Sequence, residues 1–302
     1  MGIYVETFIQ APLDRLWQHT QEPDLHAQWD LRFTSIEYLP KNAGEPQRFR
    51  YATRIGFGME IAGTGETVGE CQRPAGERSS SLKFESHDPR SLIREGAGYW
   101  KYIPAENGVR FLTWYDYRTR CGCLGAFVDR VVFRPLMGWA TAWSFDRLRL
   151  WVEQGVPPGV ALRQFLIHAC ARIALIAVFA YHGLVPKLWL RHADELTMLS
   201  DAGVSAATAP IVLQGVGIAE LLLAFCLLVA WRRRWPAVLV LILMSVATLT
   251  VAVFSPHFFG GAFNPATLNI SVAALAMIDW LTNSKQTPSA ARCLRSPPRE
   301  ES

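Results

Sequence analysis

Hydrophobic and polar residues follow different patterns in the two halves of the chain. In residues 1–153, apolar positions alternate with polar ones in short runs separated by turn residues, which is typical of antiparallel strands. In residues 160–283, Leu, Ala, Val and Ile fill long runs, each close to the roughly 20 residues that cross a bilayer. The chain therefore predicts two domains, with the Gly- and Pro-rich segment 154–159 as the linker.

The first half predicts a sheet with a few helices. We expect short helices at Leu13–Thr20 and Pro23–Trp29, and a long helix at Phe127–Glu153. The apolar face of the long helix comprises Val128, Val131, Val132, Leu136, Trp139, Trp143 and Leu150. The expected strands are Tyr4–Gln10, Thr34–Leu39, Gln47–Ile55, Met59–Val68, Arg78–Ser86, Ile93–Ile103 and Val109–Arg120.

This element order, with the segments Thr7–Trp17 and Pro23–Asp30, resembles the START/Bet v 1-like superfamily, also called SRPBCC or polyketide cyclase-like. The resemblance covers residues 1–153. It implies an α+β helix-grip domain, in which a curved antiparallel sheet surrounds a long carboxy-terminal helix. It also implies an apolar cavity between the sheet and the helix that binds lipids or other hydrophobic small molecules.

Aromatic residues in this half are candidates for lining such a cavity. Large aromatic side chains are common in ligand pockets, although ordinary core packing explains them as well. No Ser or Cys nucleophile motif accompanies the histidines, so we predict no catalytic residues and leave enzymatic activity open, leaning against it. The cavity candidates are Trp29, Trp100, Trp114, Trp139 and Trp143.

The second half predicts an all-α four-helix transmembrane bundle. The expected spans are Val160–Tyr181, Ala209–Ala230, Trp235–Phe254 and Ala266–Leu281. The first span carries Gln164, His168 and Arg172, which recur every fourth residue and therefore share one helix face. Such a helix can show its apolar side to lipid and its polar side to neighbouring helices.

Basic residues fix the expected orientation. They cluster before the first span, between the second and third spans at Arg232–Arg234, and after the fourth span. By the positive-inside rule these regions are cytoplasmic, so both termini should face the cytoplasm of a bacterial inner membrane. The tail 284–302, rich in Ser, Pro and Arg, is expected to be disordered.

Charged residues within the spans are costly, and they suggest a site or a structural pair. Arg172 lies near the middle of the first expected span and Glu220 near the middle of the second. We predict that the two side chains pair, with His168 nearby. The pair either holds the helices together or lines a small-molecule or proton site.

The segment His182–Lys187, the Glu220 helix, the Phe263–Pro265 turn and Asn269 resemble the DoxX-like family of small four-helix membrane proteins. The resemblance covers residues 165–283. Some relatives are linked to quinone-coupled or thiol redox chemistry, but the chain has no C-x-x-C and no flavin or haem motif. The residues expected at the outer face are His182, Lys187, Asn264 and Asn269, although Asn264 also suits a helix cap.

Three functions remain open from the sequence. The first is a membrane-tethered binding protein for a lipid or another hydrophobic small molecule. The second is a membrane redox component with a quinone in the bundle near Arg172 and Glu220, and the third is a regulatory or assembly partner without a small-molecule ligand. The net charge of +4 is dispersed, which argues against nucleic acid as a partner, and the cysteines and histidines lack the spacing of a metal site.

Overall fold

The computed structural model of the protein describes residues 2–56, 58–73 and 76–297. These residues form two compact units. The first comprises Met1–Ala161 together with Pro288–Ser302, and the second comprises Leu162–Thr287. Each unit is described below by itself.

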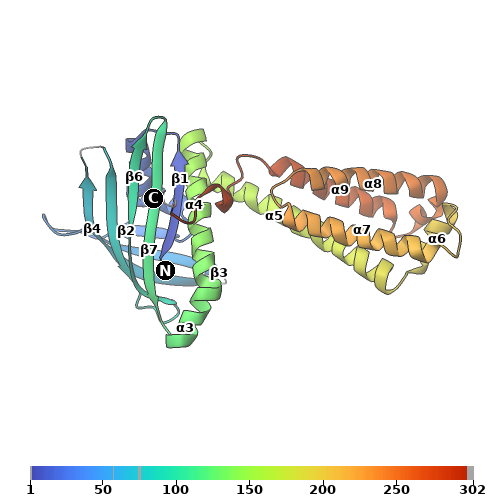
Figure 1. The fold of residues 1–302 in the computed structure, drawn as a ribbon, viewed down its shortest axis with the longest axis horizontal. Coiled ribbons are helices and arrows are strands. Elements are labelled where there is room, and N and C mark those ends of the chain that lie inside the picture. Colours follow the sequence, from blue (N-terminus) through green and yellow to red (C-terminus); the bar gives the residue numbers. More distant parts are fainter. Residues whose placement is uncertain (1, 57, 74–75, 298–302) are drawn as a thin grey trace, which may run out of the picture. The chain divides into compact units, whose positions relative to one another are not determined.

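Within the described residues, the first unit contains a seven-stranded antiparallel sheet with the strand order β1-β7-β6-β5-β4-β3-β2 (Figure 1). Strands β2 to β7 follow one another as a meander, and β1 pairs with β7 at the other edge. The strands are β1 (Ile3–Ile9), β2 (Ser35–Tyr38), β3 (Arg48–Gly56), β4 (Met59–Gln72), β5 (Arg78–Glu85), β6 (Ile93–Ala105) and β7 (Gly108–Thr119).

The helices of this unit are α1 (Leu13–Gln21), α2 (Pro23–Trp29), α3 (Gly122–Val128), a π-helical turn η1 (Asp129–Phe133) and α4 (Arg134–Gln154). The sheet wraps around α4 (Figure 1). Phe145 of α4 stacks on Phe111 of β7 with ring centroids 4.5 Å apart, and both rings are fully buried. Helix α4 is followed by the cap residue Gly155, whose φ of 69° lies in the left-handed region that favours glycine. The predicted helix-grip fold is confirmed.

The apolar face predicted for the long helix is wrong in its first half. Val131, Val132 and Leu136 are 56%, 58% and 52% exposed, whereas Trp143 and Leu150 are buried as expected. The buried side of this segment is formed instead by small or paired residues such as Gly125, Gly138 and Asp129. Asp129 is buried because it accepts hydrogen bonds from Tyr117 and Arg134.

The second unit is a helical bundle. Its elements are α5 (Pro158–His182), which begins in the first unit, the π-helical segment η2 (Gly183–Trp189), α6 (Ala193–Asp201), α7 (Ala209–Val229), α8 (Trp235–Phe254), a 3-10 turn η3 (Pro256–Gly260) and α9 (Pro265–Thr282). Among the described residues, four helical segments are long and apolar enough to cross a membrane: Pro158–Trp189, Ala209–Val229, Trp235–Phe254 and Pro265–Thr282.

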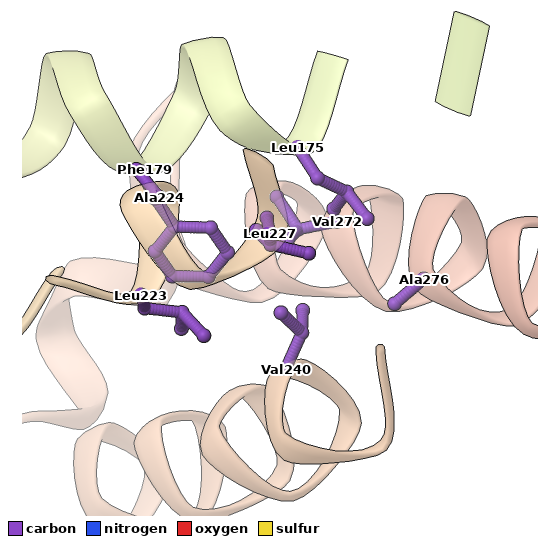
Figure 2. Packing of buried hydrophobic residues seen from close by; sticks show 8 residues of the cluster. All are labelled: Leu175, Phe179, Leu223, Ala224, Leu227, Val240, Val272 and Ala276. Atoms are coloured by element: carbon purple, nitrogen blue, oxygen red, sulfur yellow. The ribbon is translucent and has the colours of Figure 1, made fainter. Parts of the chain in front are cut away.

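The core of the bundle receives side chains from all four of these segments (Figure 2). Leu175 and Phe179 of α5 meet Leu227 of α7, Val240 of α8 and Val272 of α9. The outward-facing sides of α7 and α8 are apolar and exposed, as expected for helices whose surroundings are lipid.

The expectation of a disordered tail is wrong for the described residues up to 297. A short 3-10 turn, η4 (Ala290–Arg292), is followed by Leu294, whose backbone exchanges two hydrogen bonds of 2.9 Å with Glu6 of β1. The buried carboxylate of Asp146 accepts hydrogen bonds of 2.8 Å from the Ser289 amide and from Arg292. Composition suggested disorder, but backbone pairing at the β1 edge and a buried carboxylate hold this segment on the sheet unit.

Candidate functional site

The first unit encloses a cavity of about 640 Å³ between the sheet and the start of α4. Ligand pockets typically measure ~300–1,000 Å³, so this space suits one small molecule. The lining is largely apolar and aromatic and comes from α2, from the η1–α4 segment and from the inner face of the sheet. It includes Phe33, Ile36, Phe49, Ile61, Leu82, Phe84, Trp100, Tyr115, Phe133, Leu136 and Met137.

One cluster of polar groups at the cavity wall lies where α2 ends. Asp30, which caps α2, is 1% exposed and makes a bidentate contact with Arg32, at 2.9 Å from Nε and 2.6 Å from Nη2. His26, one turn earlier on α2, places Nε2 3.2 Å from the second carboxylate oxygen of Asp30. His26 and Arg32 line the cavity, whereas Asp30 lies behind them.

The protonation states in this cluster follow from burial and pairing. Burial alone raises the pKa of the Asp30 carboxyl, but the Arg32 guanidinium and His26 outweigh it and hold that pKa well below its usual range. Burial lowers the pKa of His26, although Asp30 partly opposes this. The cavity therefore presents a neutral imidazole and a guanidinium whose charge is already neutralised.

A second polar group lies on the α1 side. The Tyr102 hydroxyl lies 2.7 Å from the Thr20 hydroxyl and accepts a hydrogen bond of 3.0 Å from Gln21. Burial raises the pKa of Tyr102, so it stays protonated. Thr20 and Gln21 both line the cavity and offer a second place for a polar group of a ligand.

The five tryptophans predicted as cavity residues lie in different parts of the helix-grip unit. Trp100 lines the cavity. Trp29 is fully buried behind it, donates to the His19 carbonyl at 2.8 Å and stacks on His26. Trp143 is buried in the core, whereas Trp139 and Trp114 are 37% and 39% exposed. Trp114 stacks on Tyr99 with ring centroids 6.2 Å apart. Its neighbours along β7, Thr113 and Tyr115, line the cavity, and because side chains alternate along a strand, Trp114 lies on the opposite face of the sheet.

The predicted Arg172–Glu220 pair is wrong. Arg172 instead binds Asp279 of α9 through Nε and Nη2, at 2.9 and 2.8 Å, and both side chains are 0% exposed. His168 joins them, with Nδ1 2.9 Å from Asp279 and Nε2 donating to the Trp231 carbonyl at 3.2 Å. Arg172 also donates to the Arg233 carbonyl, so the cluster lies where α7 ends and α8 begins.

Glu220 belongs to a second ion cluster. The ammonium of Lys187 lies 3.2 Å from Glu220 and 3.0 Å from Glu195 of α6. Lys187 was expected in an outer loop, but the helix continues from α5 through η2 and buries it. Gly183 of η2 and Gly217 of α7 allow the two helices to approach closely, because a Cβ at either residue would lie within 3 Å of the other's carbonyl oxygen.

The other expected outer-face residues do not join this cluster through any hydrogen bond that the described residues show. Asn264 caps α9 by accepting from the Thr267 amide at 2.9 Å. Asn269 donates to Thr248 of α8 at 3.1 Å and links two helices. His182 ends α5, next to Tyr181. A quinone site that uses Arg172 and Glu220 together is therefore not formed.

The described residues contain no group of three or more His, Cys, Asp or Glu side chains placed to hold a metal ion. Sequence reasoning overlooked Asp279, although a signal was present. It is the one acidic residue in the fourth apolar run, and the rule that singled out Glu220 applies to it equally. Asp30 and Arg32 carried no comparable signal, because a short-range pair after a helix is common on protein surfaces.

Comparisons with known proteins cover both halves. Residues 176–277 match the DoxX-like family. Solved structures similar to the first half include TTHA0849 from Thermus thermophilus, with 15% identity and a TM-score of 0.38, which covers 50% of this chain and 97% of that chain. They also include a STAR-related lipid transfer protein from Xanthomonas axonopodis, with 14% identity and a TM-score of 0.39, which covers 50% of this chain and 85% of that chain.

One relative matches more of the chain than either half alone. The uncharacterized membrane protein YndG of Bacillus subtilis (strain 168) is 46% identical over 234 residues, which are 77% of this chain and 79% of that protein. The family match confirms the DoxX-like resemblance of the second half, and the first half has the expected helix-grip fold. The chain belongs to the family of YndG and is an integral membrane protein with a DoxX-like domain.

Proposed function

We propose that this protein binds a hydrophobic small molecule or a single lipid in the cavity of its helix-grip unit. The observation that carries the proposal is the cavity of about 640 Å³, whose lining is largely apolar and includes polar side chains such as His26 and Gln21. An apolar space with a few convergent polar groups is the usual form of a small-molecule site. The expected ligand is mostly apolar and carries one polar end.

The polar cluster at His26 and Arg32 favours a particular kind of polar end. Because Asp30 already neutralises Arg32, a carboxylate ligand gains less here than at a free guanidinium. A hydroxyl or carbonyl group that bonds to the neutral His26 or to Gln21 avoids that competition. The proposal therefore favours a neutral polar group over an acid.

We further propose that the helix-grip unit lies on the cytoplasmic side of a bacterial inner membrane. The basic turn Arg232–Arg234 and the basic residues beside the first and fourth spans support this orientation through the positive-inside rule. An alkaline phosphatase fusion at the carboxy terminus should be inactive and a green fluorescent protein fusion bright. The reverse result would refute the orientation.

The ligand proposal is tested with the full-length protein in detergent. Native mass spectrometry should show a co-purifying molecule, and a fluorescent fatty alcohol should bind with saturation. Ala140→Phe fills the cavity wall and should weaken binding by about tenfold or more, because a phenyl ring then occupies ligand space. The matched change Ala105→Phe, at the exposed end of β6, should leave binding unchanged.

Equal binding by both variants would show that the probe lies elsewhere and would refute the proposal. Absence of any bound molecule and of probe binding in the wild-type protein would favour the regulatory or assembly role instead. The comparison of two Ala→Phe variants separates loss of ligand space from the general effect of an added aromatic ring.

A further inference from the structure

An exposed apolar stripe runs along α3, η1 and the start of α4. It consists of Leu124, Phe127, Val128, Val131, Val132, Leu136 and Trp139, which recur at helical spacing on one face. Leu124 and Phe127 are 67% and 65% exposed. A row of exposed apolar side chains of this kind outside the membrane-spanning helices suggests an interaction site. We refer to these seven residues as the 124–139 stripe.

The surroundings of the stripe are basic. Residues 118–137 contain four arginines, of which Arg118 pairs with Glu95 and Arg134 pairs with Asp116 and Asp129. Arg130 is the one charged residue exposed between residues 122 and 139, and Arg295 lies beside α4, where it donates to the Pro135 carbonyl at 3.2 Å. Exposed apolar side chains flanked by arginines are the features of a helix that lies in the surface of an anionic bilayer.

The chain itself keeps this unit near a bilayer. Helix α4 ends at Gln154 and α5, the first membrane-spanning helix, begins at Pro158. Residues 155–157 are too few to let the helix-grip unit move far from the membrane surface. A lipid surface is therefore a partner that the tether keeps close to the helix-grip unit in every copy of the chain.

The stripe also adjoins the cavity. Leu136 belongs to the stripe, is 52% exposed and lines the cavity. Phe133 and Met137, from the same helical segment, line it as well. A molecule that leaves the bilayer at the stripe would therefore meet the cavity wall without crossing a polar surface.

We propose that the 124–139 stripe lies in the membrane surface and forms the entrance through which a hydrophobic molecule passes between the bilayer and the cavity. The entrance role rests on the proposed ligand-binding function, whereas docking of the stripe on lipid does not. The apolar face enters the headgroup region, and Arg130 and Arg295 bind lipid phosphates. The η1–α4 segment then forms both the docking surface and one wall of the cavity.

Docking is tested by photo-crosslinking of the full-length protein in nanodiscs made from equal parts of phosphatidylcholine and phosphatidylglycerol. The photoreactive residue p-benzoylphenylalanine replaces Phe127 or, as a control, Val68 of β4, which is 52% exposed. Irradiation should add the mass of a phospholipid at position 127 and not at position 68. Crosslinks from position 127 to a second copy, or to another part of the chain, would overturn docking on lipid.

The entrance role is tested by the rate at which a fluorescent fatty alcohol moves from nanodiscs into the cavity. Val131→Asp with Val132→Asp should slow this transfer by about tenfold, because both side chains are more than half exposed and their charged forms resist insertion. Val68→Asp should leave it unchanged.

A binding measurement in detergent distinguishes failure of the entrance role from failure of the ligand-binding function. The Val131→Asp/Val132→Asp protein should bind the probe as tightly as wild type in micelles, since neither residue lines the cavity. If this variant binds the probe normally and also takes it up from nanodiscs at the wild-type rate, the entrance role of the stripe is overturned. Absence of probe binding in the wild-type protein overturns the ligand function and the entrance together, while the lipid adduct at position 127 still decides docking.

Discussion

Asp279→Ala removes the carboxylate that neutralises Arg172 in the interior of the bundle. Both side chains are fully buried, and two contacts of 2.8 and 2.9 Å join them. An ordinary hydrogen bond between membrane helices contributes only ~0.6 kcal/mol on average. Removal of one partner of a buried ion pair costs ~3–5 kcal/mol, because the remaining charge is left without compensation. The second effect is several times larger and should dominate.

Other contacts of Arg172 place the expected loss near the lower end of that range. Its guanidinium also donates to the Arg233 carbonyl at 3.0 Å and lies 3.5 Å from that of Leu227. These carbonyls partly solvate the charge after Asp279 is gone, so we expect a loss of about 3 kcal/mol. The double variant Arg172→Met/Asp279→Leu removes both charges and should recover most of that loss.

The assay is equilibrium unfolding of the full-length protein in mixed micelles, followed by helical circular dichroism. Ser271→Ala is the control, because Ser271 lies on the same helix, is exposed and donates to the Thr267 carbonyl of its own helix. A loss below about 1 kcal/mol for Asp279→Ala would show that the ion pair does not stabilise the bundle. A double variant that is less stable than either single variant would refute the coupling.

Buried polar groups and close helix contacts elsewhere give three further expectations. Burial lowers the pKa of His26, so as the pH falls the imidazole is protonated in the unfolded chain before it is protonated in the folded protein. The free energy of unfolding should therefore fall as the pH drops below about 6.5. His26→Phe should reduce this pH dependence in thermal melts measured between pH 7 and pH 5. Asp146→Ala should cost ~2 kcal/mol and speed trypsin cleavage at Arg292, because it removes the carboxylate that accepts a hydrogen bond from this part-exposed arginine. Gly217→Val should lower the melting temperature through a loss of ~1–3 kcal/mol, since its Cβ would lie 2.9 Å from a facing carbonyl, whereas Gly215→Val, with open space around it, should be neutral.

Much of the fold was predictable because it depends on local patterns. Period-two alternation and turn residues located each strand of the sheet to within a few residues, and helix α2 was placed at Pro23–Trp29 as observed. The four spans followed from hydropathy and length. Such signals depend on neighbouring residues in the chain, so a single sequence contains them.

The candidate sites were less predictable because they depend on which way a side chain faces. Trp100 and Trp114 both lie in strands, but only the former faces the cavity. Arg172 appeared to match Glu220 in depth because the first span was assumed to end near Tyr181, whereas the helical segment continues to Trp189. The extension adds Lys187, which pairs with Glu220, and Arg172 pairs with Asp279 instead.

The two ion clusters bear on where ligand chemistry takes place in this protein. Arg172 and Lys187 lie fifteen positions apart on the α5–η2 segment, or about 22 Å at the rise of a helix. In the described residues, each carboxylate and each basic group of these clusters lies within ion-pair distance of a partner. A bundle that bound a charged or redox-active ligand would be expected to leave one such group directed toward the ligand. The pairing instead links α5 to α9 and η2 to α6 and α7, which favours the bundle as an anchor and the cavity of the helix-grip unit as the place where a molecule is held.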